Sequence, residues 1–177
     1  MNSSQATHLA RVRHLREAFA EANERLVARL RNATDEAAAQ RSSGGWTAAQ
    51  IGWHVASVTN RFAGLISGDV KGAQPLPAGF VERPWPAILE VIPDRLTAPE
   101  AFAPPPATTR HDAVSALEAA GMRMARAFDA ITPERGSTMG ISSPIVGGTI
   151  SVYQIGEWAT AHIIRHNRQA KRVLGEG

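Results

Sequence analysis

Two histidines four residues apart are the most informative feature of this sequence. His162 and His166 fall within a predicted helix over 149–174, and residues four apart project from the same helix face, about one turn apart. Two imidazoles in this arrangement can hold one zinc, nickel or iron ion. The spacing alone also fits two partly exposed histidines near a helix end, so it does not establish a metal site by itself.

The neighbouring side chains and a third histidine favour the metal hypothesis. Ile155 and Trp158 place the pair on or beside the apolar stripe of its helix, and burying imidazoles without partners costs free energy. His54 is the candidate for a third ligand, because it lies in the middle of a second predicted helix, on the inward face with Ile51. A single such histidine is typical of a satisfied core residue, but three that point inward favour a metal site.

Four helices must position these histidines. Apolar residues recur at steps of three and four residues, and this pattern predicts helices over 5–33, 48–66, 109–131 and 149–174. The second helix begins with a capping box, in which Thr47 is the N-cap and Gln50 follows three residues later, and it ends near Gly68. Four helices with one apolar face each predict an all-α fold, a four-helix bundle in one domain over 1–177.

A long proline-rich insert separates the second helix from the third. Nine of the eleven prolines lie between Pro75 and Pro106, and proline interrupts helices and central strands. We expect 67–108 to be an ordered crossover packed on the bundle, with a short helical turn or strand over 87–92. The later segment 134–148, ERGSTMGISSPIVGG, is expected to be a Gly/Ser loop.

The composition excludes several classes of function. The 177 residues include no cysteine, which excludes disulfides, thiolate metal sites, iron–sulfur clusters and a cysteine nucleophile. No signal peptide and no apolar run of about eighteen residues is present, so we expect a cytoplasmic protein without a membrane partner. The pI near 10.2 reflects arginine content, because the net charge is only +3 and is spread along the chain. Nucleic acid is therefore not an expected partner.

The sequence lacks the motifs of the common hydrolases and nucleotide-binding proteins, and its other candidate residues are weaker. Gln50 could hydrogen-bond a metal-bound water or a substrate, although it already serves the capping box. Arg61, two turns after the histidine of the second helix, could bind an anionic substrate or be exposed. Tyr153 could donate a proton or pack at an interface, and Glu157 is expected to point away from the histidine pair.

We expect structural positions, without a chemical role, for the other tryptophans and histidines considered. The tryptophans expected to pack around the site are Trp46, Trp53 and Trp158. The histidines expected at the surface, because they have no matching companions, are His8, His14 and His111.

Two short segments resemble a known family. The segment from Trp46 to His54, WTAAQIGWH, resembles the W-[ST]-x-x-[EQ]-[IL]-x-x-H opening of the second helix in the DinB-like (damage-inducible) superfamily. The segment 161–169, AHIIRHNRQ, resembles the closing H-x-x-x-H helix of the same superfamily. The order of the segments and the long connection after the second helix also match. The resemblance covers essentially the whole chain, and between the two motifs it is architectural.

The resemblance implies a mononuclear divalent-metal site formed by His54, His162 and His166 in a four-helix bundle, often a homodimer. Zinc or nickel is the expected ion, one per chain, with iron and manganese left open. Family members are described as metal-dependent hydrolase-like proteins or as transferases of low-molecular-weight thiols, which implies a small-molecule substrate and, for the transferases, a thiol cosubstrate. The alternative is a non-catalytic dimeric bundle with a structural metal or a small-ligand-binding role. The proline-rich insert departs from the family pattern.

Overall fold

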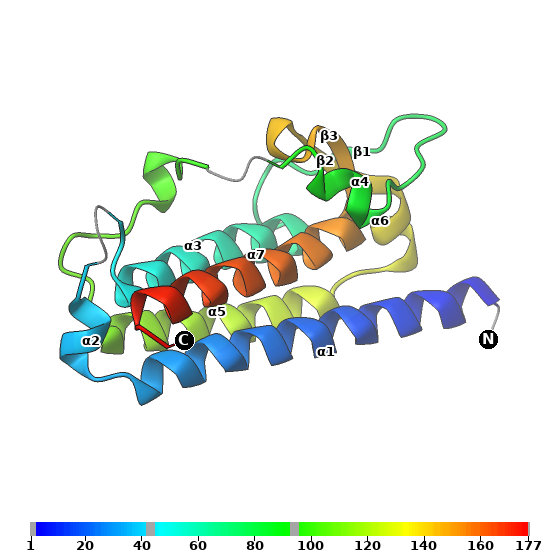
Figure 1. Cartoon of the computed structure of the whole chain (residues 1–177). Coiled ribbons are helices and arrows are strands. Elements are labelled where there is room, and N and C mark those ends of the chain that lie inside the picture. Colours follow the sequence, from blue (N-terminus) through cyan, green and yellow to red (C-terminus); the bar gives the residue numbers. More distant parts are fainter. Residues whose placement is uncertain (1–2, 42–44, 93–95, 177) are drawn as a thin grey trace.

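The computed structural model describes residues 3–41, 45–92 and 96–176. Four long helices lie side by side (Figure 1). They are α1 (Ser3–Asn32), α3 (Ala48–Ser67), α5 (Arg110–Asp129) and α7 (Val152–Val173). Helices α1 and α3 each pack against both α5 and α7. Each of the four begins and ends close to a bound predicted from the apolar pattern.

Large apolar side chains fill the space between the four helices. The fully buried ones in these helices are Leu15, Leu26, Leu30, Ile51, Ile66, Leu117, Met124, Phe128, Ile155 and Ile163. Burying one side chain of this size contributes about 1.5–3 kcal/mol. The core also needs a glycine, because a Cβ atom on Gly52 would lie 2.6 Å from Cδ1 of Leu30. Helix α3 therefore lies unusually close to its neighbours at this position.

Capping boxes fix the first turns of the two helices that carry the histidine motifs. The hydroxyl of Thr47 accepts from the backbone N–H of Gln50, and the Gln50 side chain accepts from the N–H of Thr47, as predicted. Ser151 and Gln154 form the same box at the start of α7. Helix α3 ends at Gly68, whose φ of 92° is a left-handed conformation that glycine adopts readily.

A small three-stranded antiparallel sheet accompanies the helices and was not part of the all-α prediction. Its order is β1 (Gln74–Pro75), β2 (Met139–Ser143) and β3 (Gly148–Ser151). The predicted Gly/Ser loop over 134–148 is therefore wrong. That segment holds the short helix α6 (Pro133–Thr138), then β2, the 3-10 turn η2 (Pro144–Val146) and the first residue of β3. The described part of the chain is mostly helical with one small sheet.

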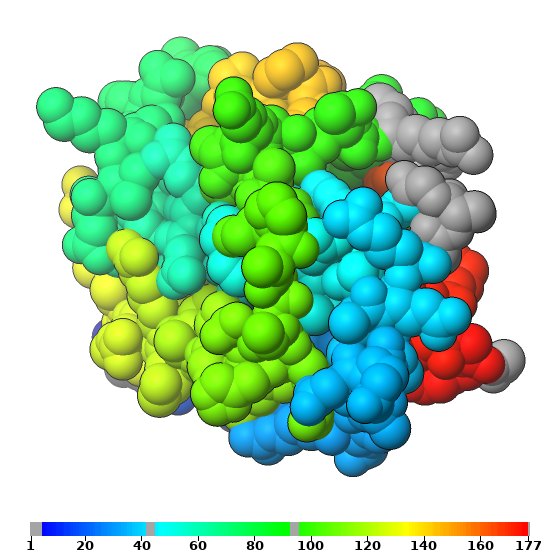
Figure 2. Space-filling model, turned by 90° about the vertical axis from the view of Figure 1, so that its left-hand side faces the viewer, coloured from blue at the N-terminus to red at the C-terminus, as the bar shows by residue number. Residues whose placement is uncertain are grey.

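The proline-rich segment 67–108 carries short elements and packs against the long helices, although its residues 93–95 lie outside the described ranges. Its elements are β1, the helix α4 (Trp85–Leu89) and the 3-10 turn η1 (Glu100–Phe102). A helical turn, α4, forms at the predicted apolar stretch, and its Ile88 is fully buried. Figure 2 shows the last part of the segment, in green, crossing one end of the molecule next to α2 (Asp35–Ala39). Among the described helices, none has the length and apolar character needed to cross a bilayer.

Candidate metal centre

Three imidazole rings meet between α3 and α7. The ring centroids of His54 and His162 are 5.2 Å apart, those of His54 and His166 are 4.9 Å apart, and those of His162 and His166 are 4.4 Å apart. One nitrogen from each ring lies within 4.8 Å of the other two. The structure therefore brings together the three histidines that the sequence singled out. We call them the histidine triad.

The proline-rich segment holds the first member of the triad. Nδ1 of His54 lies 2.9 Å from the carbonyl oxygen of Phe102. A carbonyl can only accept, so Nδ1 carries the proton and the lone pair of the ring is on Nε2. Burial lowers the pKa of His54, and the bond to Phe102 opposes this shift to a smaller extent. His54 is thus a neutral ring with Nε2 available as a ligand.

The second member, His166, is held in the same tautomer by a hydrogen bond to a residue on its own helix. Nδ1 of His166 lies 2.8 Å from Oε1 of Gln169, so this ring also carries its proton on Nδ1 and its lone pair on Nε2. Burial, followed by the charge of His54, lowers the pKa of His166 to about 4. His166 is therefore neutral at physiological pH.

The third member has no such partner. Nδ1 of His162 is buried and has no hydrogen-bond partner within the described residues. Burial lowers the pKa of His162 well below its ordinary value, and His166, His54 and Arg165 lower it further by charge repulsion. An unpartnered buried nitrogen costs free energy. Three neutral imidazoles around a common point, one of them unsatisfied, form a donor set that suits a divalent transition-metal ion.

Aromatic rings border the triad on the α3 side and the α7 side. The ring of Trp46 lies 4.8 Å from that of His54. Phe62 lies 6.4 Å from His162 and 5.0 Å from Trp158. Trp46 and Trp158 thus lie at or near the site, as expected. These rings reduce the access of water and so strengthen electrostatic interactions at the triad.

The cluster of potential ligand atoms contains three histidines and no Asp or Glu, within the part of the chain that the structure describes. A divalent ion held by three neutral nitrogens would keep its full charge. Three protein ligands also leave a coordination position for a water or a substrate, which is the pattern of catalytic zinc sites.

A comparison with protein families agrees with this geometry. The sequence model of the DinB superfamily matches residues 18–170. The chain belongs to the DinB superfamily. The match spans both histidine motifs and confirms the resemblance found in the sequence, and the DinB superfamily is metal-binding. No curated protein matches the chain significantly.

Two of the weaker candidates in this DinB-superfamily chain form hydrogen bonds with main-chain carbonyl groups. Nε2 of Gln50 lies 3.3 Å from the carbonyl oxygens of both Pro105 and Pro106, and its other side-chain atom serves the capping box. Arg61 donates to the carbonyl oxygen of Lys71 at 3.2 Å. The structure therefore gives both side chains a structural partner in or beside the proline-rich segment.

The third weak candidate, Tyr153, lies at the far end of α7. Its hydroxyl lies 2.7 Å from Nδ1 of His8, and nine residues of helix separate it from His162, a rise of about 13 Å. His8 is half-buried at this contact, so it is less exposed than expected. His14 and His111 are exposed, as expected.

A polar network that the sequence did not predict joins α1, α7 and the proline-rich segment. The guanidinium of Arg11 lies 2.8 Å from a carboxylate oxygen of Glu82 and 2.9 Å from one of Glu157. Nε1 of Trp85 donates to the other oxygen of Glu157 at 2.5 Å. We call these four residues the Arg11 clasp. Glu157 thus faces α1 and the segment, and both of its carboxylate oxygens have partners in the clasp.

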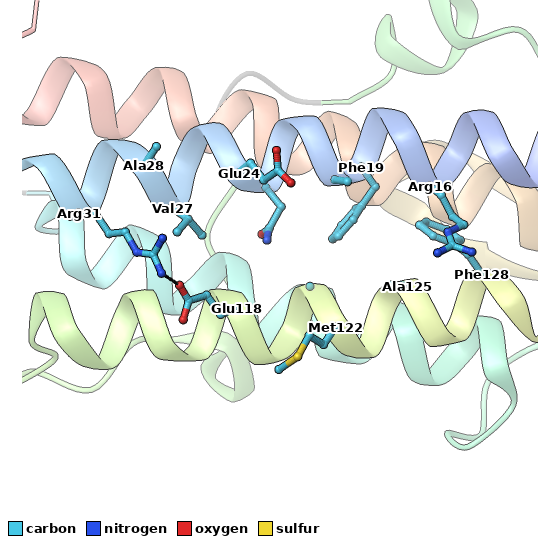
Figure 3. A pocket seen from close by; sticks show the side chains of 13 residues that line it. Arg16, Phe19, Glu24, Val27, Ala28, Arg31, Glu118, Met122, Ala125 and Phe128 are labelled. Carbon is cyan, nitrogen blue, oxygen red and sulfur yellow. Dashed lines mark hydrogen bonds and ion pairs between the residues drawn. The ribbon is translucent and has the colours of Figure 1, made fainter.

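A separate groove of about 510 Å³ runs between α1 and α5 (Figure 3). Phe19, Val27 and Phe128 contribute apolar surface to it, and an ion pair between Arg31 and Glu118 lies at one end. The histidine triad belongs to α3 and α7, so this groove is not the metal centre.

Proposed function

We propose that this DinB-superfamily chain binds one divalent metal ion through His54, His162 and His166 and is a metal-dependent enzyme. The convergence of one nitrogen from each ring within 4.8 Å carries the proposal. Zinc or nickel is the favoured ion, because both bind neutral imidazole well, and iron and manganese are the other candidates.

The proposed reaction class is hydrolysis or transfer of a low-molecular-weight thiol to a small-molecule substrate. A bound divalent ion supplies Lewis acidity, which polarises a substrate or lowers the pKa of a water or thiol. The protein contributes three neutral imidazoles, two of them oriented by hydrogen bonds, and an aromatic border that limits water. The alternative, a purely structural ion, typically has four protein ligands, and the triad supplies three.

The scaffold in this proposal is a four-helix bundle in one domain over 1–177, with 67–108 as the crossover between α3 and α5. The packing of α1 and α3 against both α5 and α7 supports it. We further propose that the protein is a homodimer. Sedimentation equilibrium of the tag-free protein tests this, and a monomeric mass at micromolar concentration would contradict it.

Elemental mass spectrometry of tag-free protein tests the metal site. The samples are the wild type, His54→Ala, His162→Ala, and the control His111→Ala, which removes an exposed histidine outside the triad. We expect about one ion per chain in the wild type and the control and none in the two triad variants. No bound metal in the wild type after reconstitution with zinc, nickel, iron and manganese salts would refute the site.

Metal-loaded protein can then be assayed for thiol transfer and for ester or amide hydrolysis. Activity that a chelator removes and the same metal restores supports the enzyme. Full metal occupancy without turnover in either screen would favour the non-catalytic alternative.

A further inference from the structure

Two glutamines fasten the proline-rich segment to the two helices that carry the histidine triad. Gln50 and Gln154 occupy the same position in the capping boxes of α3 and α7, and each uses its side-chain oxygen for the cap. The remaining amide group donates to the segment. Nε2 of Gln50 bonds the carbonyl oxygens of Pro105 and Pro106 at 3.3 Å, and Nε2 of Gln154 bonds that of Arg83 at 2.8 Å.

The Gln50 contact lies directly beside the metal centre. Gln50 precedes His54 by one helical turn on the same face of α3, and the two side chains are 4% and 5% exposed. His54 bonds the carbonyl oxygen of Phe102, and Gln50 bonds those of Pro105 and Pro106. The segment 102–106 is therefore tied to α3 at two neighbouring points.

The sequence of this segment makes the two ties dependent on each other. Pro104, Pro105 and Pro106 are consecutive, and proline rings fix φ near −65°. Because the backbone of this segment has so little freedom, the position of one end constrains the position of the other. When Gln50 holds the end at Pro105 and Pro106, it also limits where the Phe102 carbonyl can lie.

We propose that Gln50 is a positioning residue of the metal centre. It fixes the segment 102–106 so that the Phe102 carbonyl keeps the proton of His54 on Nδ1 and leaves Nε2 free for the ion. The inference rests on the proposed metal function. A histidine ligand generally donates its second ring nitrogen to a carbonyl, carboxylate or water that orients it. Here the orienting group comes from the proline-rich segment, which gives that segment a role in metal binding.

The proposal also links metal binding to the segment. Removing the Phe102 carbonyl from Nδ1 would leave a buried N–H without an acceptor or allow the proton to move to Nε2, and either change weakens ligation. Because coupling between two binding events is reciprocal, an ion at the triad must stabilise the docked segment by the same factor.

Gln50→Glu separates this role from the helix cap. A carboxylate oxygen can still accept from the N–H of Thr47, but it has no N–H to donate to Pro105 and Pro106. Gln154→Glu is the matched control, because it makes the same change in the other capping box and loses only the bond to Arg83. Zinc affinity is measured by competition with a chromophoric chelator. We expect the dissociation constant to rise about 10–100-fold in Gln50→Glu and to be unchanged in Gln154→Glu.

A second readout tests the tautomer without any metal. Long-range ¹H–¹⁵N NMR spectra of the metal-free wild type should show His54 with its proton on Nδ1, and Gln50→Glu should show a mixture of both tautomers. A merely structural role would lower the melting temperature and leave the tautomer unchanged. Wild-type zinc affinity and tautomer in Gln50→Glu, or equal loss of affinity in both variants, would overturn the proposal.

The same experiments distinguish failure of the inference from failure of the proposed function. If the wild type binds none of zinc, nickel, iron and manganese, the metal function fails, and the NMR spectra still decide whether Gln50 positions His54. If Gln50→Glu does not fold, hydrogen exchange of the wild type replaces it. Zinc should then slow the exchange of the backbone N–H groups within 99–108, and unchanged exchange would contradict the proposal.

Discussion

The Nδ1 atom of His54 lies 2.9 Å from the carbonyl oxygen of Phe102, forty-eight residues further along the chain. His166 has an equivalent acceptor in Gln169, whereas Nδ1 of His162 is buried without one in the described structure. Two members of the histidine triad are thus oriented by hydrogen bonds, and the third is left unsatisfied.

Replacing His162 should therefore raise the stability of the metal-free protein while removing a metal ligand. His162→Leu removes the unpartnered nitrogen and keeps a side chain of comparable size, so we expect the metal-free protein to gain about 1 kcal/mol in free energy of unfolding. His54→Leu removes a hydrogen-bonded ring and should lower that free energy. Urea denaturation with a chelator measures both variants. Equal losses in the two would contradict the prediction, and zinc should stabilise neither.

The stability of the metal-free protein should fall in mild acid. Burial lowers the pKa of each triad histidine, that of His166 to about 4, whereas histidine in the unfolded chain has a pKa near 6.5. As the pH falls, the unfolded chain binds protons before the folded protein does. The free energy of unfolding therefore has its full value above about pH 6.5 and declines as the pH falls toward 4.

Urea denaturation at a series of pH values, with a chelator present, measures this decline. His162→Leu has one buried histidine fewer and should decline less steeply than the wild type. A free energy of unfolding that does not change between about pH 7 and pH 5 would be inconsistent with histidines held neutral by burial.

The Arg11 clasp should contribute to stability without affecting metal binding. Trp85→Phe keeps an aromatic ring but loses the N–H that donates to Glu157, so we expect a cost of about 1–2 kcal/mol. A double-mutant cycle with Glu157→Leu, which removes the acceptor, should give a positive coupling energy. Thermal denaturation measures the cycle. Additive effects would show that the bond contributes nothing, and a changed zinc affinity would show that the clasp reaches the triad.

Gly52→Ala should loosen the packing of α3. The added methyl would lie 2.6 Å from Cδ1 of Leu30 and 3.2 Å from Cβ of Ala113. Alanine favours the helix by about 1 kcal/mol, but overpacking costs about 1–3 kcal/mol, so we expect net destabilisation. Combining it with Leu30→Ala should cost less than the sum of the single changes. Denaturant midpoints of the three variants decide this, and a Gly52→Ala protein as stable as the wild type would contradict it.

The long helices and the position of each triad histidine on its own helix could be predicted because their signals are local. Apolar residues at steps of three and four mark the buried face of each helix, and Thr47 with Gln50 marks the start of α3. The four-residue spacing of His162 and His166 places both on one face. These patterns depend on residues within one or two turns, so a single sequence shows them.

The partners of the triad and the small sheet could not be predicted in the same way. Phe102 contributes a main-chain oxygen, which any residue type supplies, so no side chain marks it. The ladder pairs Gln74 with Gly140, two residues far apart in the sequence, and glycine and serine have weak strand preference. The Arg11 clasp also depends on long-range pairing, and an arginine-rich sequence offers many equivalent ion pairs.

The division of the triad between α3 and α7 sets an order of events during synthesis. A ribosome makes the N-terminal part of a chain first, so α3, which ends at Ser67, emerges well before α7, which begins at Val152. A nascent chain that stops before α7 presents a single histidine of the triad. In the proposed site, metal capture therefore follows the synthesis of α7 and its docking on α3, and a prematurely terminated product would carry no ion there.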